Sequence, residues 1–129
     1  MHKPLSPSSI HPPFAPYSPG IEVASRSRFV FLSGQLGIAK DGTIPPDCAG
    51  QAALAFANIE AILAEAAMSL GDIVRINAFV TGREHLQPYM QVRNKLFAEP
   101  YPASTLMIVS GFARPEFVVE IEAIAATPG

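Results

Sequence analysis

The sequence predicts a single α+β domain in which two helices cover one face of a β-sheet, with the elements in the order ββαβαββ. Three observations predict this fold class. The chain has 129 residues, which suits one hydrophobic core. Hydrophobic residues make up 49% of it and charged residues 16%, a globular composition. Its apolar runs alternate between strand and helix periods, with Gly and Pro between them.

The N-terminal segment, residues 1–16, is predicted to be an irregular Pro-rich arm of this one domain, residues 1–129. Its prolines lack a backbone N–H, so the segment should run extended over the domain or fray. Two short strands are predicted next, over residues 21–24 and 28–32, paired as a hairpin. Residues 33–35, Ser-Gly-Gln, are expected to close the second of these strands.

The first predicted helix has the most regular pattern in the chain. Asp47 is placed to cap its free N–H groups, and Gly71 is placed to end it. A second helix is predicted over about residues 84–98, because apolar residues keep helical spacing there, and Pro100 and Pro102 stop it. The apolar residues of the first helix recur at three-and-four spacing, at Ala52, Phe56, Ile59, Leu63, Ala66 and Leu70.

Further strands are predicted over residues 73–81, 105–109 and 117–125. Alternate residues of a strand point to opposite faces, and both faces of the last strand carry apolar side chains. Two helices can cover only one face of a sheet. Since each buried CH₂ contributes about 0.8 kcal/mol, we expect self-association to bury the second face.

Composition and charge exclude several classes of function. The net charge is −2, the pI is about 5.9 and the basic residues are scattered, so we expect no nucleic-acid partner. One cysteine excludes an internal disulfide framework and suits a reducing cytoplasm. The longest apolar stretch is too interrupted for a membrane span, and the N-terminus lacks the apolar core of a signal peptide. We therefore expect a soluble cytoplasmic protein.

The sequence gives little support for a metal site or for a catalytic nucleophile. The histidines, at positions 2, 11 and 85, do not have the spacing of metal ligands. Cys48 has no histidine near it in the sequence and sits beside a predicted helix start, where a buried or half-exposed bystander is expected. No metal and no cofactor are expected.

Two carboxylates and one arginine are candidates for chemistry. Glu120 and Glu122 lie two apart in a predicted strand, so their Cα atoms are about 7 Å apart on one face. Such a pair can orient water, or it can simply line a solvated edge or pair with arginines. Arg93 interrupts the apolar face formed by Met90 and Phe97. It either reaches solvent along that face or holds an anion in a cleft.

Several short motifs, in this order along almost the whole chain, resemble the Rid/YjgF family. They are Ala15-Pro16-Tyr17-Ser18, Phe31-Leu32-Ser33-Gly34-Gln35, Gln51 with Asn58, Pro102-Ala103, and residues 119–125. The resemblance implies a chorismate-mutase-like (YjgF-like) fold and a homotrimer with inward-facing sheets and clefts between subunits. In the best-known branch the enzymes hydrolyse 2-imino acids or their enamine tautomers to 2-keto acids and ammonia, without cofactor or metal.

The resemblance also assigns roles to residues. Tyr17 would close the cleft, Ser33 and Gly34 would offer backbone contacts, and Glu120 would position the attacking water. The imine deaminases carry an arginine directly after Pro-Ala, where it binds the substrate carboxylate, but Ser104 stands there in this chain. The chain therefore resembles a branch without that anchor, in which Arg93 is either a relocated anchor or a sign of another substrate.

The functional prediction is a trimer whose clefts bind a small molecule such as a carboxylate. If it is a hydrolase, it should act on a small imine or enamine, deaminase-like but weak on 2-iminopropanoate. The predicted cleft consists of Tyr17, Ser33, Gly34, Arg93, Ser104 and Glu120. Three alternatives stay open: a catalytically silent binding trimer, an endoribonuclease, and a chaperone-like scaffold. A ribonuclease is disfavoured by the absence of a basic patch and of paired histidines.

Overall fold

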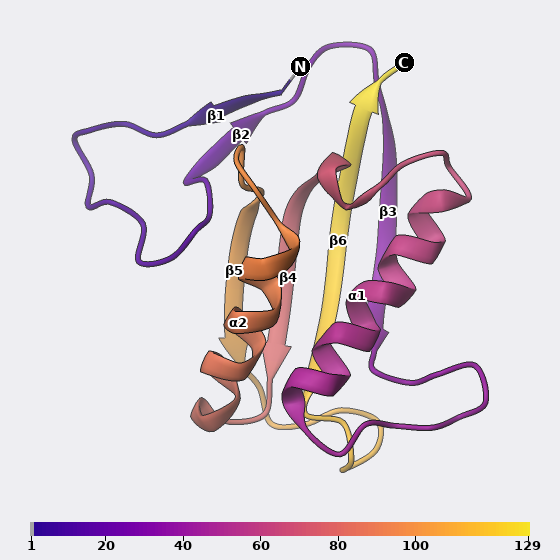
Figure 1. The fold of residues 1–129 in the computed structure, drawn as a ribbon. Coiled ribbons are helices and arrows are strands. Elements are labelled where there is room, and N and C mark those ends of the chain that lie inside the picture. Colours follow the sequence, from indigo (N-terminus) through magenta and orange to yellow (C-terminus); the bar gives the residue numbers. More distant parts are fainter. Residues whose placement is uncertain (1) are drawn as a thin grey trace.

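A computed structural model describes residues 2–129 and has the predicted α+β architecture (Figure 1). Both helices lie on one face of a four-stranded sheet, and a small two-stranded ladder projects beyond the end of that sheet. The predicted element order is confirmed, with one strand more than expected. The elements are β1 Lys3–Leu5, β2 Gly20–Glu22, β3 Ser27–Leu36, α1 Cys48–Ala64, β4 Ile73–Val80, α2 Leu86–Leu96, β5 Ala103–Ile108 and β6 Val119–Pro128, with short 3₁₀ turns at Leu70–Asp72 and Arg83–His85.

The sheet has the order β3-β6-β4-β5, so the C-terminal strand lies inside it. β6 pairs antiparallel with β3 on one side and with β4 on the other. β4 and β5 run parallel, which requires a crossover connection, and α2 supplies it. The central position of β6 brings residues from the end of the chain next to residues from its first third.

The core lies between the helices and one face of the sheet. The predicted inward set on β6, Val119, Ile121, Ala123 and Ala125, is buried, as are Ile76, Ala78 and Val80 on β4. Helix α1 covers them with Ala52, Phe56, Ile59 and Leu63, none of them more than 1% exposed. The apolar pattern of the strands, with period two, and that of helix α1, with period 3.6, therefore predicted correctly which face of the sheet packs against the helix.

Helix α1 begins as predicted but ends earlier. The Asp47 carboxylate accepts a hydrogen bond from the backbone N–H of Gly50 at 2.9 Å, which confirms the cap. The predicted end at Gly71 is wrong, because the helix ends at Ala64 and Ala67 adopts φ 56°. The apolar spacing continued past the end because Leu70, in the following 3₁₀ turn, still packs against the core.

The predicted hairpin between residues 21–24 and 28–32 is also wrong. β2 pairs with β1, so the arm predicted to be irregular contains a strand, while β3 pairs with β6. Residues 33–35 do not close β3 but lie within it, where the register to β6 shifts. The alternation of apolar and polar residues identified the strands, but which strands pair depends on segments far away in the sequence.

The N-terminal arm is attached to the sheet by one histidine ring. The backbone N–H of Ala24 donates to Nδ1 of His2 at 3.0 Å, and Nε2 of the same ring lies 2.8 Å from the carbonyl oxygen of Ala126. With the proton on Nε2, both contacts are hydrogen bonds. The ring thereby links the start of the arm to β6.

The sheet face opposite the helices carries exposed apolar side chains. Phe31 is 75% exposed, Phe29 51% and Met107 48%. Phe29 and Phe31 lie on edge strand β3 and are stacked, with ring centroids 6.3 Å apart. This is the face that the sequence predicted to need a partner.

A buried amide ties α1 to two loops. Gln51 is 1% exposed, and its Nε2 donates to the carbonyl oxygens of Pro45 and Glu116, both at 2.9 Å. Its Oε1 accepts from the N–H of Val118 at 3.0 Å. Gly37 packs so closely that a Cβ there would lie 2.5 Å from the Gln51 backbone. The side chain thus satisfies three backbone groups just before β6 and just before α1.

Replacing Gln51 by Leu should lower the free energy of unfolding by about 2–4 kcal/mol, because three partly buried backbone groups lose their side-chain partner. Urea denaturation followed by circular dichroism measures this, at one fixed protein concentration. Gln87→Leu, on the exposed side of α2, is the matched control and should change stability by no more than about 0.5 kcal/mol. A Gln51→Leu variant as stable as the control would contradict this account.

Candidate functional site

A cavity between the N-terminal arm, α2 and β5 brings together part of the predicted site. Its volume is about 260 Å³, and we call it the Arg93 pocket. Tyr17, Arg93 and Ser104, all predicted site residues, line it. The remaining walls are Phe14, Ala15, Met90 and Leu106.

The Arg93 guanidinium is buried, with only 5% of the residue exposed. Its Nη1 donates to Ser104 Oγ and its Nη2 to Asn94 Oδ1, each at 3.3 Å, while Nε has no partner. Within residues 2–129, a single ion pair has a nitrogen–oxygen distance of 4.0 Å or less, and it joins His85 and Glu84. No carboxylate in this part of the chain therefore neutralises Arg93. A buried cation of this kind is costly unless an anion joins it.

Tyr89 explains why Arg93 points inward. Tyr89 is fully buried one helical turn earlier on α2, stacked on Phe56 with ring centroids 6.2 Å apart. The guanidinium carbon lies 5.8 Å from the centre of the Tyr89 ring. Burial raises the pKa of Tyr89 to about 12, against the opposing effect of the Arg93 charge. The phenol therefore stays neutral and does not compensate the cation.

Ser33, Gly34 and Glu120 form a second group, on β3 and β6. A Cβ at Gly34 would lie 2.6 Å from the Glu120 carboxyl carbon, so the absence of a side chain at position 34 lets the glutamate lie across β3. Ser33 and Gly34 occupy the register shift between β3 and β6. The shift therefore shapes the surroundings of the carboxylate.

Glu120 and Glu122 lie on the same face, as their spacing predicted. They stand opposite Phe79 and Asn77 on β4. Asn77 donates to Glu122 at 3.3 Å and accepts from Arg75 Nε at 2.9 Å. Glu122 therefore belongs to a polar network with Asn77 and Arg75, without a direct ion pair to any arginine of residues 2–129, whereas Glu120 lies against Gly34.

The two groups lie on opposite faces of the sheet within one chain. Ser104 stands opposite the buried Ile76 on the helix side, whereas Glu120 lies on the side that the helices leave open. Within one chain, the sheet therefore separates Glu120 from the Arg93 pocket. Only a second copy could bring a Glu120 to an Arg93 pocket.

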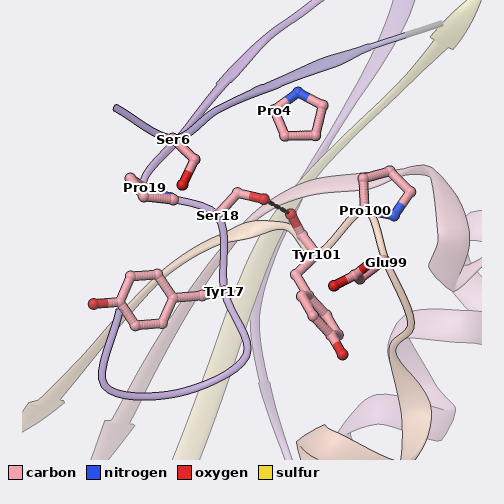
Figure 2. A pocket seen from close by; sticks show the side chains of 8 residues that line it. All are labelled: Pro4, Ser6, Tyr17, Ser18, Pro19, Glu99, Pro100 and Tyr101. Atoms are coloured by element: carbon pink, nitrogen blue, oxygen red, sulfur yellow. Dashed lines mark hydrogen bonds between the residues drawn. The ribbon is translucent and has the colours of Figure 1, made fainter. Parts of the chain in front are cut away.

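Tyr17 also borders a larger groove, of about 490 Å³ (Figure 2). The Ser18 hydroxyl donates to the Tyr101 carbonyl oxygen, and the Ser18 N–H donates to that of Pro102 at 3.1 Å. These bonds fix the arm against the connection between α2 and β5. The groove is lined by Pro4, Ser6, Tyr17, Ser18, Pro19, Glu99, Pro100 and Tyr101.

Sequence reasoning missed the apolar walls of the Arg93 pocket. Phe14 lies in the arm predicted to be irregular, and Met90 and Leu106 looked like ordinary core residues of a helix and a strand. The one available signal was an aromatic residue directly before Ala15-Pro16-Tyr17.

Cys48 does not form a rival site. Cys48 is buried, and burial raises the pKa of its thiol to about 11, so it stays protonated at neutral pH. Within residues 2–129 no three His, Cys, Asp or Glu side chains gather as a metal site. No helix in this part of the chain is long and apolar enough to cross a membrane.

Comparison with known proteins identifies the family. Residues 8–127 match the family model described as Endoribonuclease L-PSP. The chain belongs to this family. The RutC family protein YjgH of Escherichia coli K12 is 41% identical over 101 residues, which cover 77% of this chain and 76% of YjgH. The 2-iminobutanoate/2-iminopropanoate deaminase of the same strain is 28% identical over 129 residues, covering 97% and 98%.

Solved structures confirm the fold. YyfB of Yersinia pestis, described as a conserved Rid protein, superposes with a TM-score of 0.85 over 98% of both chains, at 24% identity. E. coli TdcF with bound serine gives a TM-score of 0.72 at 32% identity, over 95% of this chain and 93% of TdcF. The resemblance inferred from the motifs is therefore confirmed at the level of the Rid/L-PSP family and its fold.

Replacing Arg93 by Met should raise the free energy of unfolding by about 1–2 kcal/mol, because a buried cation gives way to an apolar side chain of similar length. Urea denaturation at equal protein concentrations measures the change. Arg83→Met, in the exposed 3₁₀ turn, is the control and should stay within about 0.5 kcal/mol of the wild type. Loss of stability in Arg93→Met would show that its hydrogen bonds outweigh the cost of burying the charge.

Proposed function

We propose that this protein is a homotrimer that binds small carboxylates at Arg93 in clefts between subunits and there hydrolyses a small imine or enamine. One observation carries the proposal: a buried, unneutralised guanidinium that lines a cavity together with Tyr17 and Ser104. A carboxylate from solution would supply the missing negative charge. It would also accept charge-assisted hydrogen bonds from the guanidinium.

The trimer is supported by the open face of the sheet. Phe29, Phe31 and Met107 expose apolar area there, and Glu120 lies on the same side. Packing these faces together would bury the aromatic rings and carry Glu120 towards a neighbouring subunit. We therefore propose a cleft with Tyr17, Arg93 and Ser104 from one subunit and Ser33, Gly34 and Glu120 from the next.

The chemistry follows from what each side chain can do. Arg93 would hold the carboxylate of a 2-imino acid, and the Glu120 carboxylate would accept a proton from water as the water oxygen attacks the imine carbon. Glu120 would then return this proton to nitrogen to give a carbinolamine. It would next move the carbinolamine hydroxyl proton to the amino group, so that the C–N bond breaks as the C=O bond forms and ammonia leaves. The products are a 2-keto acid and ammonia. The reaction consumes water alone, so its balance requires no further reactant.

Deaminase activity is proposed for this chain from its relatives' names, with one expected difference. The E. coli relative at 28% identity is named for 2-iminobutanoate and 2-iminopropanoate. With Ser104 after Pro-Ala, we propose that this chain belongs to a branch without the usual arginine and that Arg93 is its anchor. Because the anchor comes from α2 instead of β5, 2-iminopropanoate should be a weak substrate.

Light scattering coupled to size-exclusion chromatography should give a mass of about three times the 13.7 kDa of one chain. The association should depend on the open face, so Phe31→Lys should shift the protein towards monomers by placing a charge in an apolar interface. Lys40→Ala, in an exposed turn, is the control. A wild-type monomer at micromolar concentration would overturn the composite cleft.

Mixing two inactive variants tests whether subunits share the site. Arg93→Ala and Glu120→Gln should each abolish release of keto acid from imines that an L-amino-acid oxidase generates from neutral amino acids. Refolding equal amounts of the two variants together should restore about a quarter of the wild-type rate. Each cleft takes Arg93 from one subunit and Glu120 from the next, and in a random mixture each of these side chains is intact in about half of the subunits.

The outcome separates the competing functions. No recovery in mixed trimers of an otherwise active enzyme would place both residues in one subunit and contradict the shared cleft. Carboxylate binding that depends on Arg93, without turnover of any imine by the wild type, would favour the silent binding trimer. Calorimetry with pyruvate on the wild type and on Arg93→Ala supplies that measurement.

A further inference from the structure

We propose that the Arg93 pocket selects monocarboxylates with an apolar side chain, branched or aromatic, and that Phe14, Met90 and Leu106 form the side-chain subsite. The inference rests on the proposed carboxylate site at Arg93. It adds the chemical class of the ligand and the residues that determine the selectivity.

The walls of the pocket divide by polarity. The guanidinium of Arg93 and the hydroxyl of Ser104 are in contact at 3.3 Å, so two of the polar groups of the lining lie together, with the Tyr17 phenol as the third polar group. Phe14, Met90 and Leu106 come from the arm, α2 and β5, and contribute only hydrocarbon and a thioether. A ligand whose carboxylate binds the guanidinium therefore has apolar walls left for its side chain.

The charge of the lining excludes a second carboxylate. Arg93 is the one cation among the residues that line this pocket. A dicarboxylate would neutralise it with one group and leave the other among apolar side chains without a counter-ion. A charged group there has no counter-ion among the lining residues and replaces favourable apolar contact, so dicarboxylates of the same length should bind more weakly.

Phe14 adds an aromatic wall to the pocket. Its ring lines the pocket and yet is 88% exposed, supported on one side by His11 at a centroid distance of 4.9 Å. Within one chain this ring is uncovered, so it is available to pack against an apolar ligand in the proposed cleft. The cavity, at about 260 Å³, has room for more than the methyl group of pyruvate.

Isothermal titration calorimetry on the wild-type protein tests the selectivity with a series of 2-oxo acids. From pyruvate through 2-oxobutanoate to 4-methyl-2-oxopentanoate, affinity should rise about fourfold for each carbon buried. Phenylpyruvate should bind at least as well as 4-methyl-2-oxopentanoate. The decisive pair is 4-methyl-2-oxopentanoate and 2-oxoglutarate, which have similar lengths, and the dicarboxylate should bind at least about tenfold more weakly.

Variants assign the preference to the subsite. Met90→Gln keeps the length of the side chain and should reduce the ratio of 4-methyl-2-oxopentanoate to pyruvate affinity at least about fivefold, with pyruvate affinity nearly unchanged. Phe14→Ser, at an exposed position where folding is not at risk, should reduce the same ratio. Leu96→Gln, on the exposed side of the same helix, is the control and should leave the ratio unchanged.

The result also separates this inference from the proposed function. If every 2-oxo acid binds equally well and Arg93→Ala abolishes all binding, the carboxylate site stands and the apolar subsite is refuted. Preference for 2-oxoglutarate, or ratios unchanged in both subsite variants, would refute it as well. If the wild type binds none of these acids, the carboxylate site itself fails.

Discussion

The pairing of β6 with both β3 and β4 is the constraint on which the rest of the structure depends. Placing the last strand in the middle of the sheet directs Val119, Ile121 and Ala123 towards the helices. The same strand must then direct Glu120 and Glu122 to the other side, because its side chains alternate. The core and the candidate catalytic carboxylate are thus two consequences of one strand, and they lie on opposite faces of it.

A buried cation is the second organising feature. Helix α2 anchors itself in the core with Tyr89, and the turn that follows carries Arg93 into the same layer. Ser104 and Asn94 satisfy two of its nitrogens through long hydrogen bonds, and no carboxylate of residues 2–129 neutralises it. A side chain selected for stability alone would be apolar at this position. This buried charge is the observation on which the proposed carboxylate site rests.

The N-terminal arm turns a hollow beside α2 into a pocket. Its backbone is held at two points, by the His2 ring against β6 and by Ser18 against the loop before β5. Between them the arm presents Phe14 and Tyr17 to the Arg93 pocket. A segment whose prolines prevent regular pairing over most of its length is suited to this role, since its side chains face the domain without competing for the sheet.

The sequence by itself determined the fold class, the type and order of most elements, the Asp47 cap and which side chains of β4 and β6 face the core. It also determined that Glu120 and Glu122 share a face, because these properties follow from local periodicity and local hydrogen bonding. Only the tertiary structure decided that β2 pairs with β1, that residues 33–35 form a register shift beneath Glu120, and that Phe14, Met90 and Leu106 meet around Arg93. Those features arise from contacts between residues far apart in the chain, which no local pattern encodes.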